Sequence, residues 1–224
     1  AVPGARTVID LGAQLSRWIR LARRDGSPPD VAEFATNGLC AAGSGSFLEQ
    51  QADRLDMSVA ELSERARRAE RGASIAGRCS VFAKSDMIHL QQKGTPLDEI
   101  AYGLCLALDR TFVSTVISGR PVEPPVVLAG GGADSSGLVR ALREILDLDE
   151  GTGVVPDGAT RLGAWGAALV ADGAPRRLAE LVRIAREAAS RDAQGSGAAG
   201  LESLGPHFRA SERGAEVPEL PPAG

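Results

Sequence analysis

Residue types that commonly bind metals are scarce in this chain, which has three cysteines and two histidines among 224 residues. Three cysteines are too few, and odd in number, for the disulfide framework of a small secreted protein. His89 and His207 have no second histidine or carboxylate at metal-ligand spacing, so we expect neither to serve a site. We find no signal peptide and no long apolar run, which predicts a cytoplasmic protein without a membrane span.

An excess of basic charge and a large share of aromatic side chains are also missing. The formal net charge is −4 with both signs interspersed, which argues against a nucleic-acid-binding surface. Aromatic residues make up only 4% of the chain, whereas hydrophobic residues reach 43% and glycines number 27. This is enough apolar material for a substantial core. The small residues suit close helix packing and the approach of backbone to a ligand, or they reflect a GC-rich genome.

The hydrophobic pattern predicts a sheet that begins with an antiparallel meander. Three strands, over residues 7–11, 16–22 and 31–35, are separated by short turns, and Asp25-Gly26 is a hairpin signal. Four helices follow, over 47–55, 57–71, 80–93 and 97–117. Ser46 and Glu49 have capping-box spacing at the start of the first helix, and Gly94 ends the third. The second helix is expected to be mostly exposed.

The remainder of the folded part alternates strands and helices, with strands over 126–129 and 154–155 and helices over 138–146 and 162–170. A three-stranded meander followed by alternating helices and strands is the plan of the ribonuclease-H-like nucleotide-binding fold. We therefore expect an α/β protein of that fold with a helical insertion.

The domain organisation that we expect has three parts. A folded domain covers 1–174 and includes a helical insert at about 40–95, and a C-terminal helix covers 175–190. Residues 191–224 are rich in glycine, serine and proline and too poor in apolar residues to fold, so we expect a flexible tail or a linker there. The first residue is not methionine, and we expect the chain to be part of a longer protein.

Three glycine-containing turns could carry chemistry. Asp10, in D-L-G-A-Q at the end of the first strand, could approach phosphate and Mg²⁺, although D-x-G alone is also a common turn. Gly43-Ser44-Gly45 leads into a helix and could bind an anion, or it could simply let the chain turn. Gly130-Gly131-Gly132 follows a buried strand, which is where open α/β sheets bind ligands, and close approach of a base or ribose would explain three glycines.

Two cysteines share a local pattern. Cys40 and Cys79 each follow a glycine by two residues and each precede a predicted helix, but they are too far apart for a short metal-binding knuckle. Thiolates at helix N-termini are stabilised by the helix dipole and make good iron ligands. Two such ligands are half of what a four-iron cluster needs, so a second copy of the chain would supply the rest across a dimer axis. Cys105 lies in the middle of a predicted helix and is expected to be an inert core thiol.

With these segments in place, the chain resembles the ATPases that activate acyl-CoA dehydratases and serve benzoyl-CoA reductases, the BadF/BadG/BcrA/BcrD type. The resemblance rests on T-V-I-D-L-G-A-Q, N-G-L-C-A-A-G-S-G-S-F-L-E, C-S-V-F-A-K-S-D-M-I, V-V-L-A-G-G-G-A and L-G-A-W-G-A-A-L. These stretches span Thr7 to about Val170, and the two that contain Cys40 and Cys79 are the specific ones.

The resemblance implies the second half of an acetate kinase/sugar kinase/Hsp70/actin (ASKHA) fold, a homodimer, and one [4Fe-4S] cluster held by Cys40 and Cys79 of each subunit. It implies that ATP binding and hydrolysis to ADP drive a low-potential electron onto an iron–sulfur dehydratase or reductase that acts on an acyl-CoA. A ferredoxin or flavodoxin would be the electron donor. Asp10 and Gln14 would manage Mg²⁺ and the attacking water, and the nucleotide would contact Gly12, Gly43, Ser44, Gly45, Gly130, Gly131 and Gly132.

Two departures from the family pattern leave alternatives open. The half that carries the first phosphate loop is absent, and Gln14 is followed by Leu15 where the family usually has an acidic residue. We therefore expect weak ATP turnover by this chain alone, which could be a fragment of a longer activase. The alternatives are a small-molecule kinase of the same fold without a cluster, and a catalytically silent half-module that dimerises and carries electrons.

Overall fold

The computed structural model describes residues 2–22, 29–38, 44–76 and 80–170, together with 183, 186 and 187. The chain divides into two units, Ala1–Ala171 and Asp172–Gly224, and the elements described below all lie in the first. Several predictions from the sequence concern residues outside this description. They are the Asp25-Gly26 turn, Cys40, Gly43, Cys79, nearly all of the C-terminal helix, and the tail.

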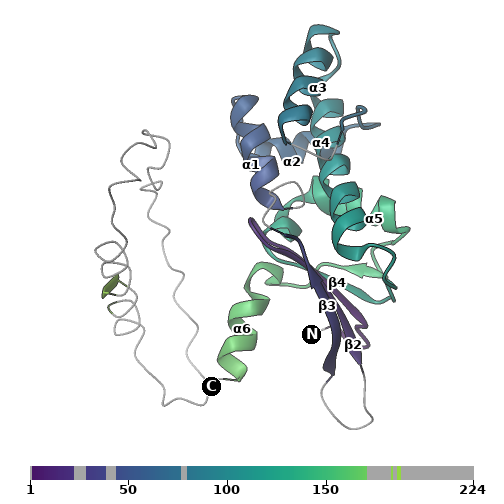
Figure 1. Ribbon diagram of the computed structural model, residues 1–224, viewed down its shortest axis with the longest axis vertical. Helices are drawn as coiled ribbons and strands as arrows, with labels where there is room; N and C mark the ends of the chain where they lie inside the picture. The colour runs from purple at the N-terminus through teal and green to yellow at the C-terminus, as the bar shows by residue number, and fades with distance from the viewer. Residues whose placement is uncertain are drawn as a thin grey trace. The chain divides into compact units, whose positions relative to one another are not determined.

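A five-stranded mixed sheet in the order β3-β2-β1-β4-β5 forms the base of the first unit (Figure 1). The strands are β1 (Thr7–Leu11), β2 (Ser16–Ala22), β3 (Asp30–Thr36), β4 (Val126–Ala129) and β5 (Gly153–Val154). The first three form an antiparallel meander, whereas β4 pairs parallel with β1 and β5 pairs parallel with β4. The predicted meander, followed along the chain by two strands that alternate with helices, is confirmed.

The two faces of the sheet differ in burial. Ile9 pairs with Trp18 on one face, where both side chains are fully buried and pack with Phe112 and Leu142. On the other face Ile19 pairs with Phe34, whose side chain is 65% exposed. The period of two along each strand thus separates a covered face from a face that the described helices leave largely open.

Helices α1 to α4 are gathered beyond one end of the strands, as Figure 1 shows, and they form a second core with α5. The helices are α1 (Gly45–Arg54), α2 (Val59–Arg68), α3 (Ser80–Gln92), α4 (Leu97–Phe112), α5 (Ser136–Leu146) and α6 (Leu162–Leu169). A π-helical segment (Val113–Ile117) extends α4, and short 3-10 turns lie at Gly131–Asp134 and Ala159–Arg161.

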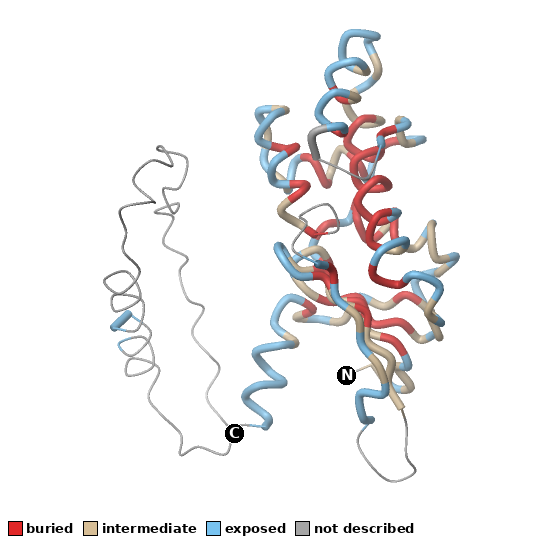
Figure 2. Tube along the Cα trace, viewed as in Figure 1, coloured by how far each residue is buried: buried red, intermediate tan, exposed pale blue. Residues whose placement is uncertain are grey.

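The central helix α4 is buried along nearly its whole length (Figure 2). By length and composition the segment Leu97–Ile117 could cross a membrane, contrary to the expectation of no long apolar run, but 78% of its most apolar window is buried inside the protein. Contacts with α2 and α5 account for this burial. Ile100, Leu104 and Leu108 lie on one face of the helix, and because the residues between them are buried as well, α4 is covered all round.

Two helix starts differ from the predictions. Helix α1 begins after Ser44 rather than Ser46, and no side chain caps it, because backbone carbonyls elsewhere accept its first amides. The predicted capping box is therefore wrong. Helix α2 begins after Ser58, whose Oγ accepts a hydrogen bond from the Glu61 amide over 3.1 Å, and its inner face at Leu62 and Ala66 is fully buried. The prediction of a mostly exposed helix holds only for its outer face.

Candidate functional site

The turn from β1 to β2 lies against the start of α1. The Gly45 amide donates a hydrogen bond to the Gly12 carbonyl over 2.9 Å, and the Ser46 amide donates to the Ala13 carbonyl over 2.8 Å. Amides at a helix N-terminus have no partner within the helix, and here the turn supplies one. A phosphate held at this place would therefore need other groups of the turn, because the Gly45 amide is already in use.

Glycine is required in this turn. A Cβ at Gly12 would overlap the carbonyl oxygen of Leu15, and a Cβ at Gly45 would lie 3.3 Å from the Cα of Ala13. The turn is thus folded tightly onto itself and onto α1. The predicted site residues Gly12 and Gly45 are brought together, and Ser44 lies fully buried beside them with its Oγ 3.1 Å from that of Ser46.

Asp10 sits where the ends of β1 and β4 meet. Its Oδ2 accepts a hydrogen bond from Arg17 Nη1 over 2.6 Å, and the carboxylate side chain remains 25% exposed. Gly130, with a φ of +81°, lies directly beside it, and a Cβ there would overlap Asp10 Oδ1 and lie 2.6 Å from the carbonyl oxygen of Leu11. Only glycine has room here, and only glycine adopts this backbone conformation without strain.

The three consecutive glycines have different surroundings. A Cβ at Gly132 would lie 2.6 Å from the Cβ of Leu11, whereas a Cβ at Gly131 would meet nothing within 4 Å. Gly130 and Gly132 are therefore packed against β1, and Gly131 faces open space. Packing within the protein explains Gly130 and Gly132, so close approach of a ligand stays a prediction for Gly131 alone.

Two cavities adjoin Gly131. One of about 150 Å³ is lined by Ala13, Gly45 and Gly132 among others, and one of about 390 Å³ is lined by Ser63, Glu64, Asp134 and Ser136. Both cavities are also lined by Val59, Gly131 and Ser135. They therefore lie next to each other, between α1, α2 and the start of α5. A further cavity of about 410 Å³ lies on the Asp10 side of Gly130 and reaches Thr160 and Leu162.

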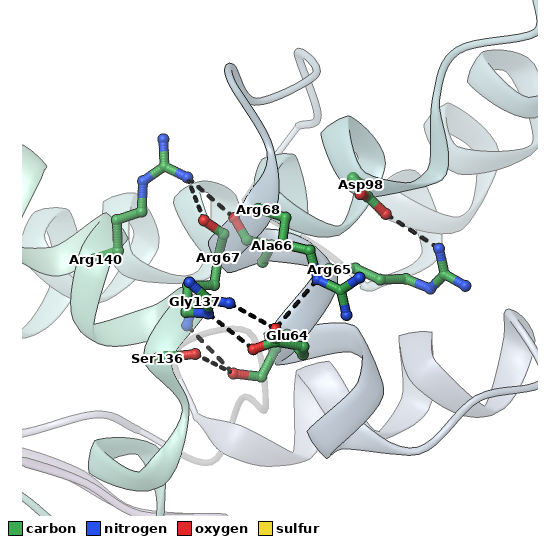
Figure 3. A network of polar contacts seen from close by, with 10 residues as sticks. Glu64, Arg65, Ala66, Arg67, Arg68, Asp98, Ser136, Gly137 and Arg140 are labelled. Atoms are coloured by element: carbon green, nitrogen blue, oxygen red, sulfur yellow. Dashed lines mark hydrogen bonds and ion pairs between the residues drawn. The ribbon is translucent and has the colours of Figure 1, made fainter.

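The larger of the adjoining cavities has a carboxylate on its wall that the sequence analysis missed. Glu64 accepts two hydrogen bonds from Arg67, over 2.8 and 2.7 Å, and one from Arg68 over 3.1 Å (Figure 3). These hydrogen bonds and the positive charges lower the pKa of Glu64 to about 2, so the group is ionised at any physiological pH. In the sequence Glu64 lies within residues 57–71, which we predicted to form a mostly exposed helix.

A hydroxyl network fixes the same wall. The Ser63 Oγ lies 3.0 Å from the Ser135 Oγ and 3.3 Å from the Ser136 Oγ, and it accepts a hydrogen bond from the Gly137 amide over 3.2 Å. Ser135 in turn caps α5 by accepting a hydrogen bond from the Leu138 amide. Because these bonds join α2 to α5, the cavity wall is built from two helices that are held in a fixed relation.

The described residues contain no group of three or more histidine, cysteine or acidic side chains that could hold a metal ion. Cys105 is fully buried on α4, and burial raises the pKa of its thiol, which suits the inert core role that the sequence predicted. Cys40 and Cys79, the two predicted cluster ligands, lie outside the described residues.

The fold is that of activator ATPases of the actin/Hsp70-like class. The activator of the 2-hydroxyisocaproyl-CoA dehydratase from Clostridium difficile with bound ADPNP matches with a TM-score of 0.68 and 32% identity, over 75% of this chain and 60% of that one. The Acidaminococcus fermentans (R)-2-hydroxyglutaryl-CoA dehydratase component A matches with a TM-score of 0.67 and 31% identity, over 75% and 62%.

The sequence defines the family more closely. The model of the BadF/BadG/BcrA/BcrD ATPase family matches residues 1–171, and the chain belongs to that family. The activator of lactoyl-CoA dehydratase from Anaerotignum propionicum is 36% identical over 170 residues, which are 76% of this chain and 62% of that protein. The chain thus spans about three fifths of the length of each of these relatives.

Proposed function

We propose that this chain is the nucleotide-responsive part of an activator that delivers low-potential electrons to an enzyme acting on an acyl-CoA. The observation that carries the proposal is the meeting of three distant segments around adjoining cavities: the Gly12–Ser16 turn, the start of α1 and Gly130–Gly132. Membership of an ATPase family supports ATP as the nucleotide, and the names of the relatives support the kind of partner.

The nucleotide would occupy the cavities beside Gly131. The adenosine would lie between α2 and Gly131, where the Glu64 carboxylate is available to accept hydrogen bonds from ribose hydroxyls. The phosphates would extend toward the Gly12–Ser16 turn, with Asp10 as a hard oxygen ligand suited to Mg²⁺ and Gln14 placed to orient water. Gly12, Gly43, Ser44, Gly45, Gly130 and Gly132 would let backbone approach the nucleotide or keep the turns tight.

Cys40 and Cys79 would hold a [4Fe-4S] cluster together with the same two residues of a second copy. When bound, such a cluster supplies one-electron chemistry at low potential. Support for coupling to the nucleotide comes from the residues on both sides of Cys40. Asn37, before it, and Gly45, after it, both form hydrogen bonds to the Gly12–Ser16 turn. A nucleotide that moves this turn would therefore act on both flanks of the cysteine.

The remaining parts of the proposal concern the partners, the assembly and the location of the protein. The acceptor would be an iron–sulfur dehydratase or reductase that uses an acyl-CoA, and the donor a ferredoxin or flavodoxin. The protein would work as a homodimer in the cytoplasm. Its relatives are activators of lactoyl-CoA, 2-hydroxyisocaproyl-CoA and (R)-2-hydroxyglutaryl-CoA dehydratases, and these names give the class of partner that we propose.

Anaerobic purification followed by iron and sulfide analysis tests the cluster. We expect about four irons per dimer and a broad visible absorption, which Cys40→Ser and Cys79→Ser abolish. Cys105→Ser is the matched control and should keep the iron, because Cys105 is buried in the core of the helical layer. Equal iron content in the three variants would reject the assignment of the ligands.

Iron content and the response to nucleotide together separate the proposed function from the two alternatives, a small-molecule kinase and a silent half-module. A small-molecule kinase of this fold would bind ATP without any iron. A silent half-module would bind iron, but ADP and an ATP analogue would leave its visible spectrum and protease sensitivity unchanged. The pairing of Arg17 with Asp10 favours keeping the silent module as the second candidate, because the carboxylate is already neutralised within the protein.

A further inference from the structure

Asn37, a residue to which the sequence analysis assigned no role, uses both ends of its side-chain amide on one turn. Its Oδ1 accepts a hydrogen bond from the Ser16 amide over 2.7 Å, and its Nδ2 donates to the Gln14 carbonyl over 3.0 Å. Its own backbone amide donates to the Ser16 carbonyl over 3.2 Å. Asn37 is only 8% exposed, so these bonds form away from bulk water.

The turn is thus held from two sides. Asn37 bonds to its second half at Gln14 and Ser16, while α1 bonds to its first half through the Gly12 and Ala13 carbonyls. With its carbonyl held by Asn37, Gln14 keeps a defined backbone position, which fixes where its side chain leaves the chain. Both a donor and an acceptor are required, and among side chains of this length only asparagine supplies them as a neutral planar amide.

We propose that Asn37 is the positioning residue of the phosphate site, holding the Gly12–Ser16 turn and Gln14 in the form that accepts the terminal phosphates of ATP. This inference rests on the proposed function. It adds a residue outside the turn that acts through the turn and does not touch the nucleotide. The adenosine end of the site, at Glu64 and Gly131, lies on other elements and is independent of Asn37.

The proposal predicts a selective loss of phosphate binding. Asn37→Asp keeps the acceptor for the Ser16 amide but sets a carboxylate oxygen against the Gln14 carbonyl. We expect its affinity for a non-hydrolysable ATP analogue with Mg²⁺ to fall about tenfold, the effect of losing one buried hydrogen bond. Its affinity for adenosine should stay within about twofold of the wild type. A role in folding alone would not separate the two ligands.

The test is titration calorimetry on the whole chain, with Gln51→Glu as the matched control. Gln51 is a fully buried amide on α1 that bonds to the Phe47 carbonyl and to Arg54, away from the turn. Its replacement should leave the ratio of the two affinities unchanged. Asn37→Ser, too short to reach either partner, is the second variant and should show at least the same selective loss.

The possible outcomes test the positioning role of Asn37 and the proposed function separately. Wild-type affinities in Asn37→Asp and Asn37→Ser, or an equal loss for both ligands, would overturn the positioning role while leaving the proposed function intact. Failure of both variants to fold would also overturn it, since Asn37 would then serve the fold. A wild-type chain that binds neither ligand would contradict the proposed function itself.

Discussion

Arg17 on β2 donates a hydrogen bond to Asp10 on the neighbouring strand β1 over 2.6 Å. The two residues are directly opposite in the register, so the ion pair follows from the pairing of the strands and needs no tertiary contact. The positively charged guanidinium of Arg17 therefore lies beside the Asp10 carboxylate, which we propose as the Mg²⁺ ligand. Binding of the metal therefore has to compete with a neighbouring guanidinium.

Replacement of Asp10 by asparagine should remove the metal dependence of nucleotide binding. Asparagine fits the recess beside Gly130 but lacks the charge that Mg²⁺ prefers. We expect Mg²⁺ to raise the ADP affinity of the wild type about tenfold and that of Asp10→Asn less than about twofold, as measured by calorimetry. Arg17→Gln should act in the opposite direction. Asp53→Asn, at an exposed carboxylate on α1, is the control, and equal Mg²⁺ effects in all variants would contradict the role of Asp10.

Replacement of Gly130 by alanine should lower the free energy of unfolding far more than replacement of Gly131. Alanine at Gly130 would collide with Asp10 and with the Leu11 carbonyl and would also need a φ of +81°, so we expect a loss of about 2 to 4 kcal/mol in the free energy of unfolding. Alanine at Gly131 meets nothing within 4 Å and should leave stability within about 0.5 kcal/mol. Urea unfolding monitored by circular dichroism measures both, and similar values for the two variants would contradict the packing described.

Asp109 should make the protein less stable as the pH rises. It is fully buried on α4, neither carboxylate oxygen has a hydrogen-bond partner among the described residues, and burial raises its pKa well above the usual value. Below about pH 4 both states are protonated. Above that pH the unfolded state loses its proton while the folded state keeps it, so the free energy of unfolding falls by about 1.4 kcal/mol per pH unit until the folded pKa is reached.

Asp109→Asn removes this linkage. We expect the variant to be more stable than the wild type at pH 7 and the difference to vanish near pH 4, as followed by urea unfolding across that range. Asp53→Asn, at an exposed position, should follow the wild-type profile. A variant that is less stable than the wild type at pH 7 would show that Asp109 has a stabilising partner.

Cys105 should be unreactive in the folded protein. It is fully buried, and a raised pKa keeps its thiol protonated at pH 8. In a Cys40→Ser, Cys79→Ser double variant Cys105 is the remaining thiol. We expect a thiol reagent to label it within seconds in denaturant and at least about a hundredfold more slowly without it, since labelling then waits for opening. Fast labelling of the folded chain would contradict its burial.

Much of the architecture could be predicted from local patterns. The hydrophobic pattern predicts all five described strands and most of the helices, because it reflects which side chains must be buried. The start of α1 was predicted wrongly because its first amides bond to a turn more than thirty residues earlier in the chain. No local signal reports such a bond, and the sequence offered a plausible serine at another position.

For the candidate site, too, some features could be predicted from the sequence and others depend on the tertiary structure. The sequence by itself determined the family, because the family pattern extends over residues 1–171. It also determined the glycines of the turns and the acidic residue at the end of β1, because a missing side chain and a charge are properties of single residues. Only the tertiary structure decided which of these groups meet. It set Asn37 on the turn, packed Gly130 against Asp10, and placed Glu64 on a cavity wall, since hydrogen bonds and close packing between distant segments depend on the folded chain as a whole.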